Sequence, residues 1–394
     1  FSMRVAFYTL GCKVNQYESQ SMELALIKRG FECVGASEEA DVYIVNSCTV
    51  TAESDRKTRQ NVRHLRKLHP DAVIVLTGCM PQAFPEDARL LTQADIVTGN
   101  RSNKQIPDMI DEFFRTRERI VRIAQHENGE KFSGELINDF RERTRATVKI
   151  EDGCNRFCSY CVIPYARGRV RSKPLEDIRE EISSLEKKGF SEIVLVGINL
   201  SAYGTDCGAS ICDAVELAAS FDGIKRVRLG SLEPDHMTPE VTKRLAECKK
   251  LCPQFHISLQ SGCDKTLKRM NRHYTAAEYE ELCTRLRSEF EDTTLTTDVM
   301  VGFSGETKED FEISRDFVRK IGFEKVHVFP YSRRAGTRAA EFPDVVENAE
   351  KERRSREMIA AAGEVRHEFL ERQIGRTAEV LFEEKLRYGS IQGY

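Results

Sequence analysis

The sequence GCNRFCSYC, residues 153–161, places Cys154, Cys158 and Cys161 at a C-x3-C-x2-C spacing. Three thiolates this close together can hold three corners of a 4Fe–4S cluster, because iron in such clusters is bound by cysteine sulfur. The fourth iron then has no protein ligand, so a substrate or a cofactor can coordinate it. We call these three residues the loop cysteines.

A zinc site is the alternative for the loop cysteines. Structural zinc sites usually combine a C-x2-C pair with a second pair of ligands further along the chain. Here a C-x3-C spacing precedes C-x2-C, and no matching pair follows closely. The spacing therefore favours an iron–sulfur cluster with one open iron.

At these residues the chain resembles the radical S-adenosylmethionine (SAM) superfamily, whose signature has an aromatic residue directly before the third cysteine, here Tyr160. The resemblance implies that the open iron binds SAM. It also implies that one electron cleaves SAM to methionine and a 5′-deoxyadenosyl radical, and that an external donor such as flavodoxin or ferredoxin supplies this electron.

Length and composition limit the other possibilities. The 394 residues are enough for two or three domains, and no apolar run approaches the ~20 residues of a membrane span. No secretory signal is apparent, and thirteen cysteines is an odd number for a secreted disulfide framework. We expect a cytoplasmic protein without a membrane partner. With a net charge of −3, any nucleic-acid binding must use local basic patches.

The first domain is expected over residues 3–135. Short β-branched runs at Arg4–Thr9, Val42–Asn46 and Ala72–Thr77 alternate with helical patterns at Gln16–Arg29 and Ser54–Leu68. Alternating strands and helices predict an α/β domain with a parallel sheet, of the Rossmann or flavodoxin-like type.

Each of these three strands is followed by a cysteine, namely Cys12, Cys48 and Cys79, which we call the strand-end cysteines. The carboxyl ends of parallel strands lie along one edge of the sheet, where ligands bind. Three buried structural cysteines would be the alternative, since cysteine is common in cores. Because a cysteine follows all three strands, we expect a second open 4Fe–4S cluster here.

With both sets of cysteines in this order, the chain resembles the methylthiotransferase family of radical SAM enzymes, over residues 3 to about 331. Asn15 fits the first motif of that family. The local sequence TLGCKVNQYES, residues 9–19, looks most like the subgroup that acts on threonylcarbamoyladenosine. The other subgroups act on isopentenyladenosine in tRNA and on an aspartate of a ribosomal protein.

The second domain is expected over residues 145–341, where six strand–helix units suggest a partial (βα)6 barrel. Polar residues and glycines at the expected strand ends are candidates for contacts to SAM, although each alone could be a cap or a turn former. Together with Tyr160, these cofactor-binding candidates are Gly197, Asn199, Ser231, Glu233, Gln260, Asp298 and Gly302.

Several segments could contact RNA. Asn15 and the arginines after the loop cysteines, Arg167, Arg169 and Arg171, are candidates for substrate or RNA binding, or for contacts to an anionic cluster or the SAM carboxylate. The basic helix Ser54–Leu68 is equally well explained as a solvated face. A polar linker is expected over Glu127–Asp139, and the basic run Arg141–Arg145 continues the linker or contacts RNA.

A connecting helix is expected within 342–373, followed by a strand over Ile374–Phe382. In the family, a small β-barrel RNA-binding (TRAM-like) module starts at this position. Residues 374–394 are too few for the several strands of a complete barrel, so we expect an incomplete one.

The function that follows is transfer of a methylthio group to carbon 2 of threonylcarbamoyladenosine, next to the anticodon of tRNA. The family resemblance implies two 4Fe–4S clusters, and SAM both as radical source and as methyl donor. It requires no protein acid or base as a catalytic residue. Two other classes remain open: a zinc-dependent RNA-binding module, and an electron-transfer protein with closed four-cysteine clusters.

Overall fold

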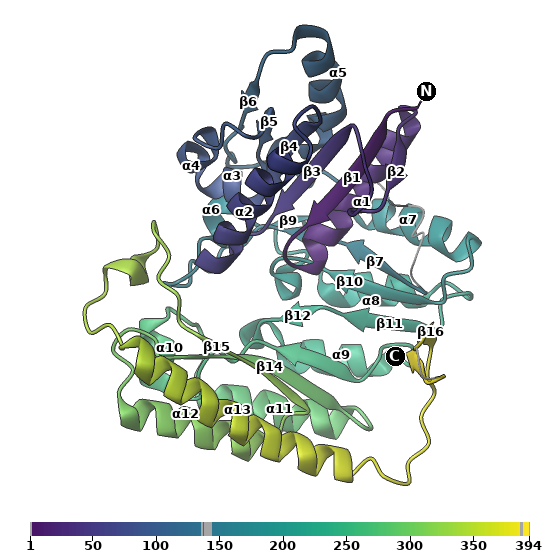
Figure 1. The fold of residues 1–394 in the computed structure, drawn as a ribbon. Helices are drawn as coiled ribbons and strands as arrows, with labels where there is room; N and C mark the ends of the chain where they lie inside the picture. Colours follow the sequence, from purple (N-terminus) through teal and green to yellow (C-terminus); the bar gives the residue numbers. More distant parts are fainter. Residues whose placement is uncertain (1, 135–136, 138–143, 387–388, 394) are drawn as a thin grey trace. The chain divides into compact units, whose positions relative to one another are not determined.

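A computed structural model describes residues 2–134, 137, 144–386 and 389–393 (Figure 1). The chain forms two compact units. Unit 1 contains residues 1–137, 151–173 and 332–337, and unit 2 contains residues 138–150, 174–331 and 338–394. The basic run at 141–143 and part of the expected linker lie outside the described residues.

Unit 1 contains a six-stranded parallel sheet in the order β2-β1-β3-β4-β5-β6. Its strands are β1 (Arg4–Thr9), β2 (Glu32–Val34), β3 (Val42–Ser47), β4 (Val73–Gly78), β5 (Ile96–Thr98) and β6 (Ile120–Arg122). Every residue of β3 and β4 is buried, which explains their continuous apolar sequences. The three predicted strands are confirmed, and the short strands β2, β5 and β6 are additional.

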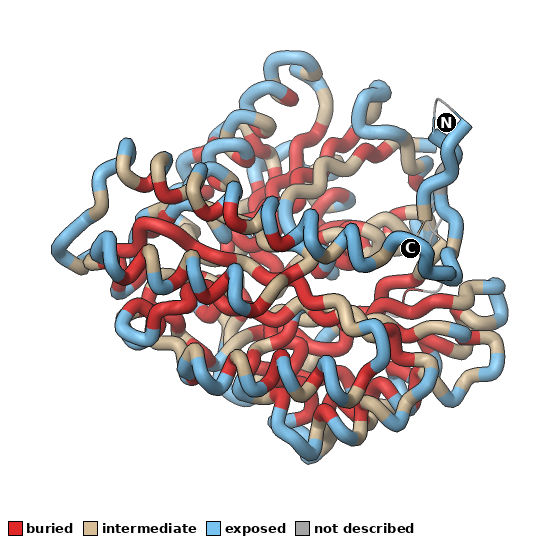
Figure 2. Tube along the Cα trace, turned by 90° about the horizontal axis from the view of Figure 1, so that it is seen from below, coloured by how far each residue is buried: buried red, intermediate tan, exposed pale blue. Residues whose placement is uncertain are grey.

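Helices cover both faces of this sheet. They are α1 (Lys13–Lys28), α2 (Ala52–Leu68), α3 (Cys79–Ala83), α4 (Pro85–Arg89), η1 (Asn100–Gln105) and α5 (Ile106–Thr116). Val5 of β1 packs in one core with residues of α1 and α5, whereas Ala6 packs in a second core with residues of α2, α3 and α4. Figure 2 shows buried residues along the strands and exposed residues on the outer turns of the helices.

The strand order reverses between β1 and β3, because α1 leads from β1 to β2 on one side and the chain then crosses to β3 on the other. This is the flavodoxin-like order, and ligands bind at such a switch point, outside the carboxyl ends of the strands. Cys12 follows β1 and Cys48 follows β3, so both residues stand at the switch point.

The segment with the loop cysteines belongs to unit 1, although residues 145–341 are expected as one domain. β8 (Glu151–Asp152) pairs antiparallel with β9 (Arg171–Ser172), and the chain between them contains α6 (Ile163–Arg167). We call residues 153–170 the cluster loop. Its side chains contact α1 and α3, as described below, and these contacts between distant parts of the sequence cannot be read from local patterns.

Where the structure describes unit 2, it contains seven parallel-paired strands in two sheets, β7-β10-β11 and β12-β13-β14-β15. They are β7 (Arg145–Lys149), β10 (Glu192–Val196), β11 (Arg226–Leu229), β12 (Ser231–Leu232), β13 (Gln254–Ile257), β14 (Thr294–Val301) and β15 (Lys325–Pro330). Only Gly230 separates β11 from β12, so these two short strands correspond to one predicted strand that is divided between the two sheets. The seven strands therefore account for the six predicted strand–helix units, in chain order.

Helices follow the strands of unit 2 along the chain. They are α7 (Leu175–Lys187), η2 (Leu200–Ala202), α8 (Ile211–Ala219), η3 (Pro234–His236), α9 (Pro239–Glu247), α10 (Asp264–Arg269), α11 (Ala276–Glu289), α12 (Lys308–Ile321), η4 (Arg338–Glu341) and α13 (Asn348–Glu371). α13 packs against α12 and β15. No helix of the described residues is long and apolar enough to cross a membrane.

The last strands differ from the prediction. A strand expected over Ile374–Phe382 is absent from the described residues, and β16 (Phe382–Lys385) instead begins where the prediction ends. It pairs antiparallel with β17 (Ile391–Gly393). Ile374 and Phe382 are both exposed, so these apolar side chains do not indicate a buried strand in this structure.

Candidate iron–sulfur sites

The strand-end cysteines come together at the carboxyl edge of the sheet in unit 1. Cys12 precedes α1, Cys48 follows β3, and Cys79 is the first residue of α3. Gly11, at φ +109°, packs so closely on Cys48 that a Cβ atom at Gly11 would lie 2.8 Å from the Cys48 Cβ. A glycine is therefore required for the first and second cysteine segments to approach each other.

Asn15 joins the segments that carry these cysteines. Its Nδ2 donates hydrogen bonds to the carbonyls of Leu10 and Ser47, both at 2.9 Å. Its Oδ1 lies 3.6 Å from the Cys12 Sγ. Asn15 is 1% exposed, so the structure places this predicted substrate-binding residue in the scaffold of the cysteine site rather than on the surface.

The thiols of the strand-end cysteines affect one another's pKa. Burial raises the pKa of the Cys48 thiol, and the nearby Cys12 raises it further. Burial raises the pKa of Cys79 to about 12, with Cys48 and Cys12 adding to the shift and Arg167 opposing it. Deprotonating these buried thiols thus requires a compensating positive charge, which a bound iron cluster supplies.

The soft sulfur donors of both sets of cysteines fit iron–sulfur clusters. Within residues 2–134, 137, 144–386 and 389–393, no group of three or more His, Cys, Asp or Glu is arranged to hold a metal ion. A cubane differs from a single ion, because each corner takes one thiolate and the ligands surround the whole cluster. Three thiols converge beside the buried guanidinium of Arg167, and this observation supports a 4Fe–4S cluster at the strand-end cysteines.

The loop cysteines are held by backbone contacts within the cluster loop. Cys154 N donates to the carbonyl of Gly168 at 3.0 Å, and Cys161 N donates to the carbonyl of Cys158 at 3.0 Å. Ile163 N lies 3.4 Å from the Cys161 Sγ, which makes it a donor to a thiolate at that position. Tyr160, the predicted aromatic neighbour, is half-buried.

The three arginines after the loop cysteines have different environments. Arg167 is 1% exposed, and its Nε lies 3.2 Å from the Cys79 Sγ. Arg171 is also buried, where it donates to the carbonyls of Arg167 and Arg169 at 2.8 and 2.9 Å. Arg169 is exposed and lies over the ring of Phe157 at 4.6 Å. Only Arg169 is therefore accessible to an RNA phosphate or base.

In unit 2, the SAM candidates lie at or near the carboxyl ends of the strands, except Asp298, which lies within β14. Asn199 and Gly197 follow β10; Ser231 lies in the short strand β12, instead of following a strand as expected. Glu233 forms an ion pair with Arg272 at 2.5 Å. Arg272 cannot be predicted from the sequence, because no local pattern links it to Glu233, 39 residues earlier.

Gln260 shows the strongest sign of a ligand contact in unit 2. It has φ +67°, a conformation that costs free energy for a residue other than glycine. In the described part of the chain its Oε1 is buried and has no hydrogen-bond partner. A strained backbone and an unsatisfied buried acceptor at the end of a parallel strand are typical of a binding site.

The remaining two candidates have internal partners. Asp298 accepts a hydrogen bond from His256 at 3.2 Å when that ring nitrogen carries a proton. Gly302 N donates to Glu306 Oε1 at 2.8 Å, and Arg354 of α13 pairs with the same carboxylate at 2.7 Å. Gly302 thus helps to attach α13 to the end of β14.

Three further residues of the cysteine site were not found from the sequence. Arg334 is buried and donates to Asp55 at 2.8 Å and to the hydroxyl of Thr49, next to Cys48, at 2.7 Å. His126, directly before the expected linker, lies 3.1 Å from Asn100 Oδ1, and Asn100 Nδ2 lies 3.8 Å from the Cys79 Sγ.

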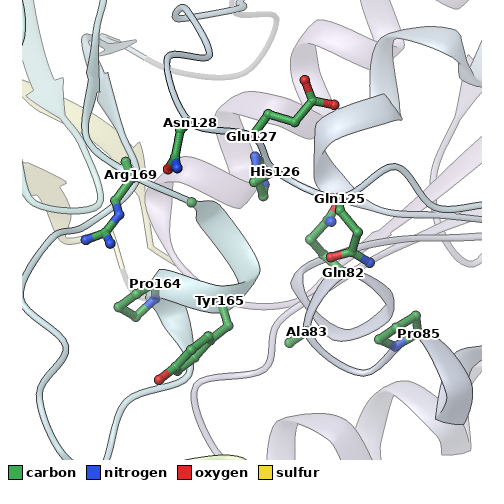
Figure 3. A pocket seen from close by; sticks show the side chains of 11 residues that line it. Gln82, Ala83, Pro85, Gln125, His126, Glu127, Asn128, Pro164, Tyr165 and Arg169 are labelled. Atoms are coloured by element: carbon green, nitrogen blue, oxygen red, sulfur yellow. The ribbon is translucent and has the colours of Figure 1, made fainter.

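A pocket of about 420 Å³ lies beside the cluster loop within unit 1. Figure 3 shows Pro164 and Tyr165 of α6 on one side of it and Gln82 and Ala83 of α3 on the other. His126 and Arg169 also line it. Since α3 begins with Cys79 and α6 follows the loop cysteines, the pocket adjoins both cysteine segments.

Three cysteines on a loop beside a parallel βα fold define the class of a radical SAM enzyme. Residues 148–318 match the family model described as Radical SAM superfamily, and residues 4–99 match the one described as Uncharacterized protein family UPF0004. Membership of the superfamily implies SAM and a 4Fe–4S cluster. The chain belongs to the tRNA methylthiotransferase family within this superfamily, as its similarity to curated relatives shows.

Among these relatives is the threonylcarbamoyladenosine tRNA methylthiotransferase MtaB of Thermotoga maritima, which is 39% identical over 99% of this chain and 89% of the relative. The MtaB of Aquifex aeolicus is 36% identical over 98% of this chain and 94% of its own length. The tRNA-2-methylthio-N(6)-dimethylallyladenosine synthase of Pelotomaculum thermopropionicum is also 36% identical, over 96% and 86%.

The fold is also similar to that of solved radical SAM enzymes. The methyltransferase TsrM from Kitasatospora setae matches with a TM-score of 0.60 and 16% identity, over 84% of this chain and 75% of that one. At this identity only the fold is shared. The family membership decides in favour of an enzyme and against the zinc-dependent RNA-binding module and the electron-transfer protein.

Proposed function

We propose that this enzyme transfers a methylthio group to carbon 2 of N6-threonylcarbamoyladenosine, next to the anticodon of a tRNA. The convergence of the three strand-end cysteines at the carboxyl edge of the sheet in unit 1 is the observation that carries this proposal, because it supplies thiols for a second cluster beside the one that the superfamily implies. The cysteine chemistry needs a reducing compartment, so the proposal places the enzyme in the cytoplasm.

The choice of the threonylcarbamoyladenosine subgroup is based on similarity to relatives. Two relatives that are 36% and 39% identical are named for threonylcarbamoyladenosine, and one that is 36% identical is named for dimethylallyladenosine. The local sequence around Cys12 favours the former. Isopentenyl-type adenosine is thus the alternative substrate, and the aspartate of a ribosomal protein is a more distant one.

Each set of cysteines would hold one 4Fe–4S cluster. When bound, the cluster on the loop cysteines supplies the electron for SAM cleavage, and the one on the strand-end cysteines carries the sulfur. Asn199, Gln260 and the other candidates at the strand ends of unit 2 would orient SAM. The buried side chains of Asn15 and Arg167 around Cys79 would exclude water from the cluster. An external flavodoxin or ferredoxin would deliver the electrons.

The cluster loop offers a contact for an RNA base. Tyr165 is 52% exposed, and its ring lies 5.7 Å from that of Phe157 in an edge-to-face arrangement. Arg169 covers the Phe157 ring on the same loop. Exposed aromatic rings and arginines are the side chains on which unpaired RNA bases stack. We infer that a base of the anticodon loop binds at Tyr165 and Arg169, beside the pocket in Figure 3.

Replacing Tyr165 by Ala is expected to weaken binding of an anticodon stem-loop RNA about tenfold, because base–aromatic stacking contributes roughly 1–3 kcal/mol. Fluorescence anisotropy of the labelled RNA measures this change. Leu90→Ala, an exposed apolar residue of unit 1 outside the cluster loop, serves as the control. Equal affinities of wild type and Tyr165→Ala would rule out this contact.

The proposed function is tested by mass spectrometry of tRNA nucleosides from cells that lack the gene and from the same cells after its return. We expect 2-methylthio-N6-threonylcarbamoyladenosine to disappear and then to reappear. Loss of the 2-methylthio derivative of isopentenyladenosine instead would establish the alternative substrate. A nucleoside profile that does not respond to the gene would contradict both.

A further inference from the structure

The buried residue Arg167 connects the two sets of cysteines. It is the last residue of α6, six residues after Cys161, and its side chain reaches across to the first residue of α3. There its Nε lies 3.2 Å from the Cys79 Sγ, a suitable position for a hydrogen bond to a thiolate. A residue of the cluster loop thus contacts a ligand of the other proposed cluster.

The guanidinium of Arg167 is held in one orientation by its other contacts. Its two terminal nitrogens donate to both oxygens of Glu18, one of them at 3.0 Å, and Nη2 also donates to Asn15 Oδ1 at 2.9 Å. Asp152 Oδ2 lies 3.5 Å from Nη1. A bidentate carboxylate fixes the planar guanidinium, so that Nε–H remains directed at the sulfur.

A buried ion pair between Arg167 and Glu18 does not by itself require the contact between Arg167 and Cys79. Glu18 and Asp152 both lie beside Arg167, and Asp152 also lies 3.4 Å from Arg171. Arg167 thus faces two carboxylates even before any thiolate forms. Its one donor that is not directed at a carboxylate or an amide is Nε–H, and this donor faces Cys79.

We propose that Arg167 is a positioning residue for the cluster on the strand-end cysteines, with two effects. Its hydrogen bond and charge stabilise the more negative, reduced state of that cluster, which raises its reduction potential. Its contacts also fasten the cluster loop to the sheet of unit 1, so that both cysteine sites keep a fixed separation. This inference rests on the proposed function, since it requires two clusters.

The test compares Arg167→Lys with Arg169→Lys, a matched control that is exposed on the same loop. Both are made in a chain whose loop cysteines are replaced by Ala, so that only the other cluster remains. A redox titration followed by electron paramagnetic resonance measures the reduced fraction. We expect Arg167→Lys to lower the ratio of reduced to oxidised cluster at a fixed potential about tenfold, which corresponds to a 59 mV shift for one electron. Arg169→Lys should leave the ratio unchanged.

Several results decide the question. Arg167→Lys protein that keeps its iron and titrates like the wild type overturns the inference, as does an equal shift in Arg169→Lys. Loss of this iron in Arg167→Lys alone, with an unchanged circular dichroism spectrum, supports it. Should Arg167→Lys fail to fold, Glu18→Asp withdraws the carboxylate from Arg167 without changing the net charge. A lowered ratio there supports the inference, and a wild-type ratio overturns it.

The inference and the proposed function fail in distinguishable ways. Wild-type protein that binds only one cluster, or that leaves the tRNA nucleosides unchanged, contradicts the proposed function. Wild-type protein with two clusters and full methylthio transfer, together with an unaltered potential in Arg167→Lys, contradicts only the role of Arg167.

Discussion

Replacing Cys79 by Ala is expected to remove half of the bound iron and to abolish methylthio transfer, while cleavage of SAM continues. Cys79 is one of three thiolates in its site, and a cluster held by only two is not retained. The loop cysteines remain intact, so the radical chemistry does not depend on Cys79. Iron and sulfide analysis, a SAM-cleavage assay and nucleoside mass spectrometry of the same anaerobic preparation measure the three quantities.

Two companion variants make this prediction specific. Cys158→Ala should also lose half of the iron, but with it SAM cleavage, because this residue belongs to the loop cysteines. Cys207→Ala, an exposed cysteine outside both sets, should keep all the iron and both activities. The assignment of two separate clusters is wrong if Cys79→Ala keeps the full iron content, or if it loses SAM cleavage together with methylthio transfer.

Gly153→Ala should prevent the cluster loop from closing and remove the cluster on the loop cysteines. Gly153 has φ +88°, and a Cβ atom there would lie 2.0 Å from the carbonyl oxygen of Arg169. This atom belongs to the backbone, so no side-chain rotation relieves the overlap. The two ends of the cluster loop must then move apart. This movement breaks the hydrogen bond from Cys154 N to Gly168 O. Iron content, the cluster absorbance and SAM cleavage all report the loss.

Gly189→Ala is the matched control for this variant. Gly189 also has φ +88°, but a Cβ atom there would meet nothing within 4 Å. It should therefore show only the cost of the left-handed conformation, roughly 1–2 kcal/mol, and keep its iron. A denaturation curve measures this cost. Similar iron contents in the two variants would mean that the close packing of Gly153 against Arg169 is unimportant for cluster binding.

Local patterns predicted much of this fold and pointed to the cysteines that we propose as ligands of both clusters. β1 agrees residue for residue with the predicted strand, β3 extends one residue further than predicted, and β4 is shifted by one residue. Buried parallel strands are continuous β-branched runs, and such runs are visible in the sequence itself. The cysteine that follows each strand indicated the site, because parallel strands end at a common edge.

The C-terminal strand shows where the same reasoning fails. Residues 374–382 have the composition of a strand, yet β16 begins only at Phe382. A strand needs a partner and a face to bury, and composition does not reveal whether either is present. For the same reason, the short strands β2, β5 and β6 were not predicted, since each depends on a neighbour in the sheet more than on its own three residues.

The sequence by itself determined the spacing of the loop cysteines and the position of the strand-end cysteines after parallel strands, because thiolate spacing and apolar runs are local properties of the chain. Only the tertiary structure decided that Arg167 and Arg171 are buried while Arg169 is exposed, and that Glu18, His126 and Arg334 belong to the cysteine site. Each of these residues acts through partners that are distant in sequence. The packing of these distant segments decides which charged side chains form buried ion pairs. A local sequence pattern does not contain this information.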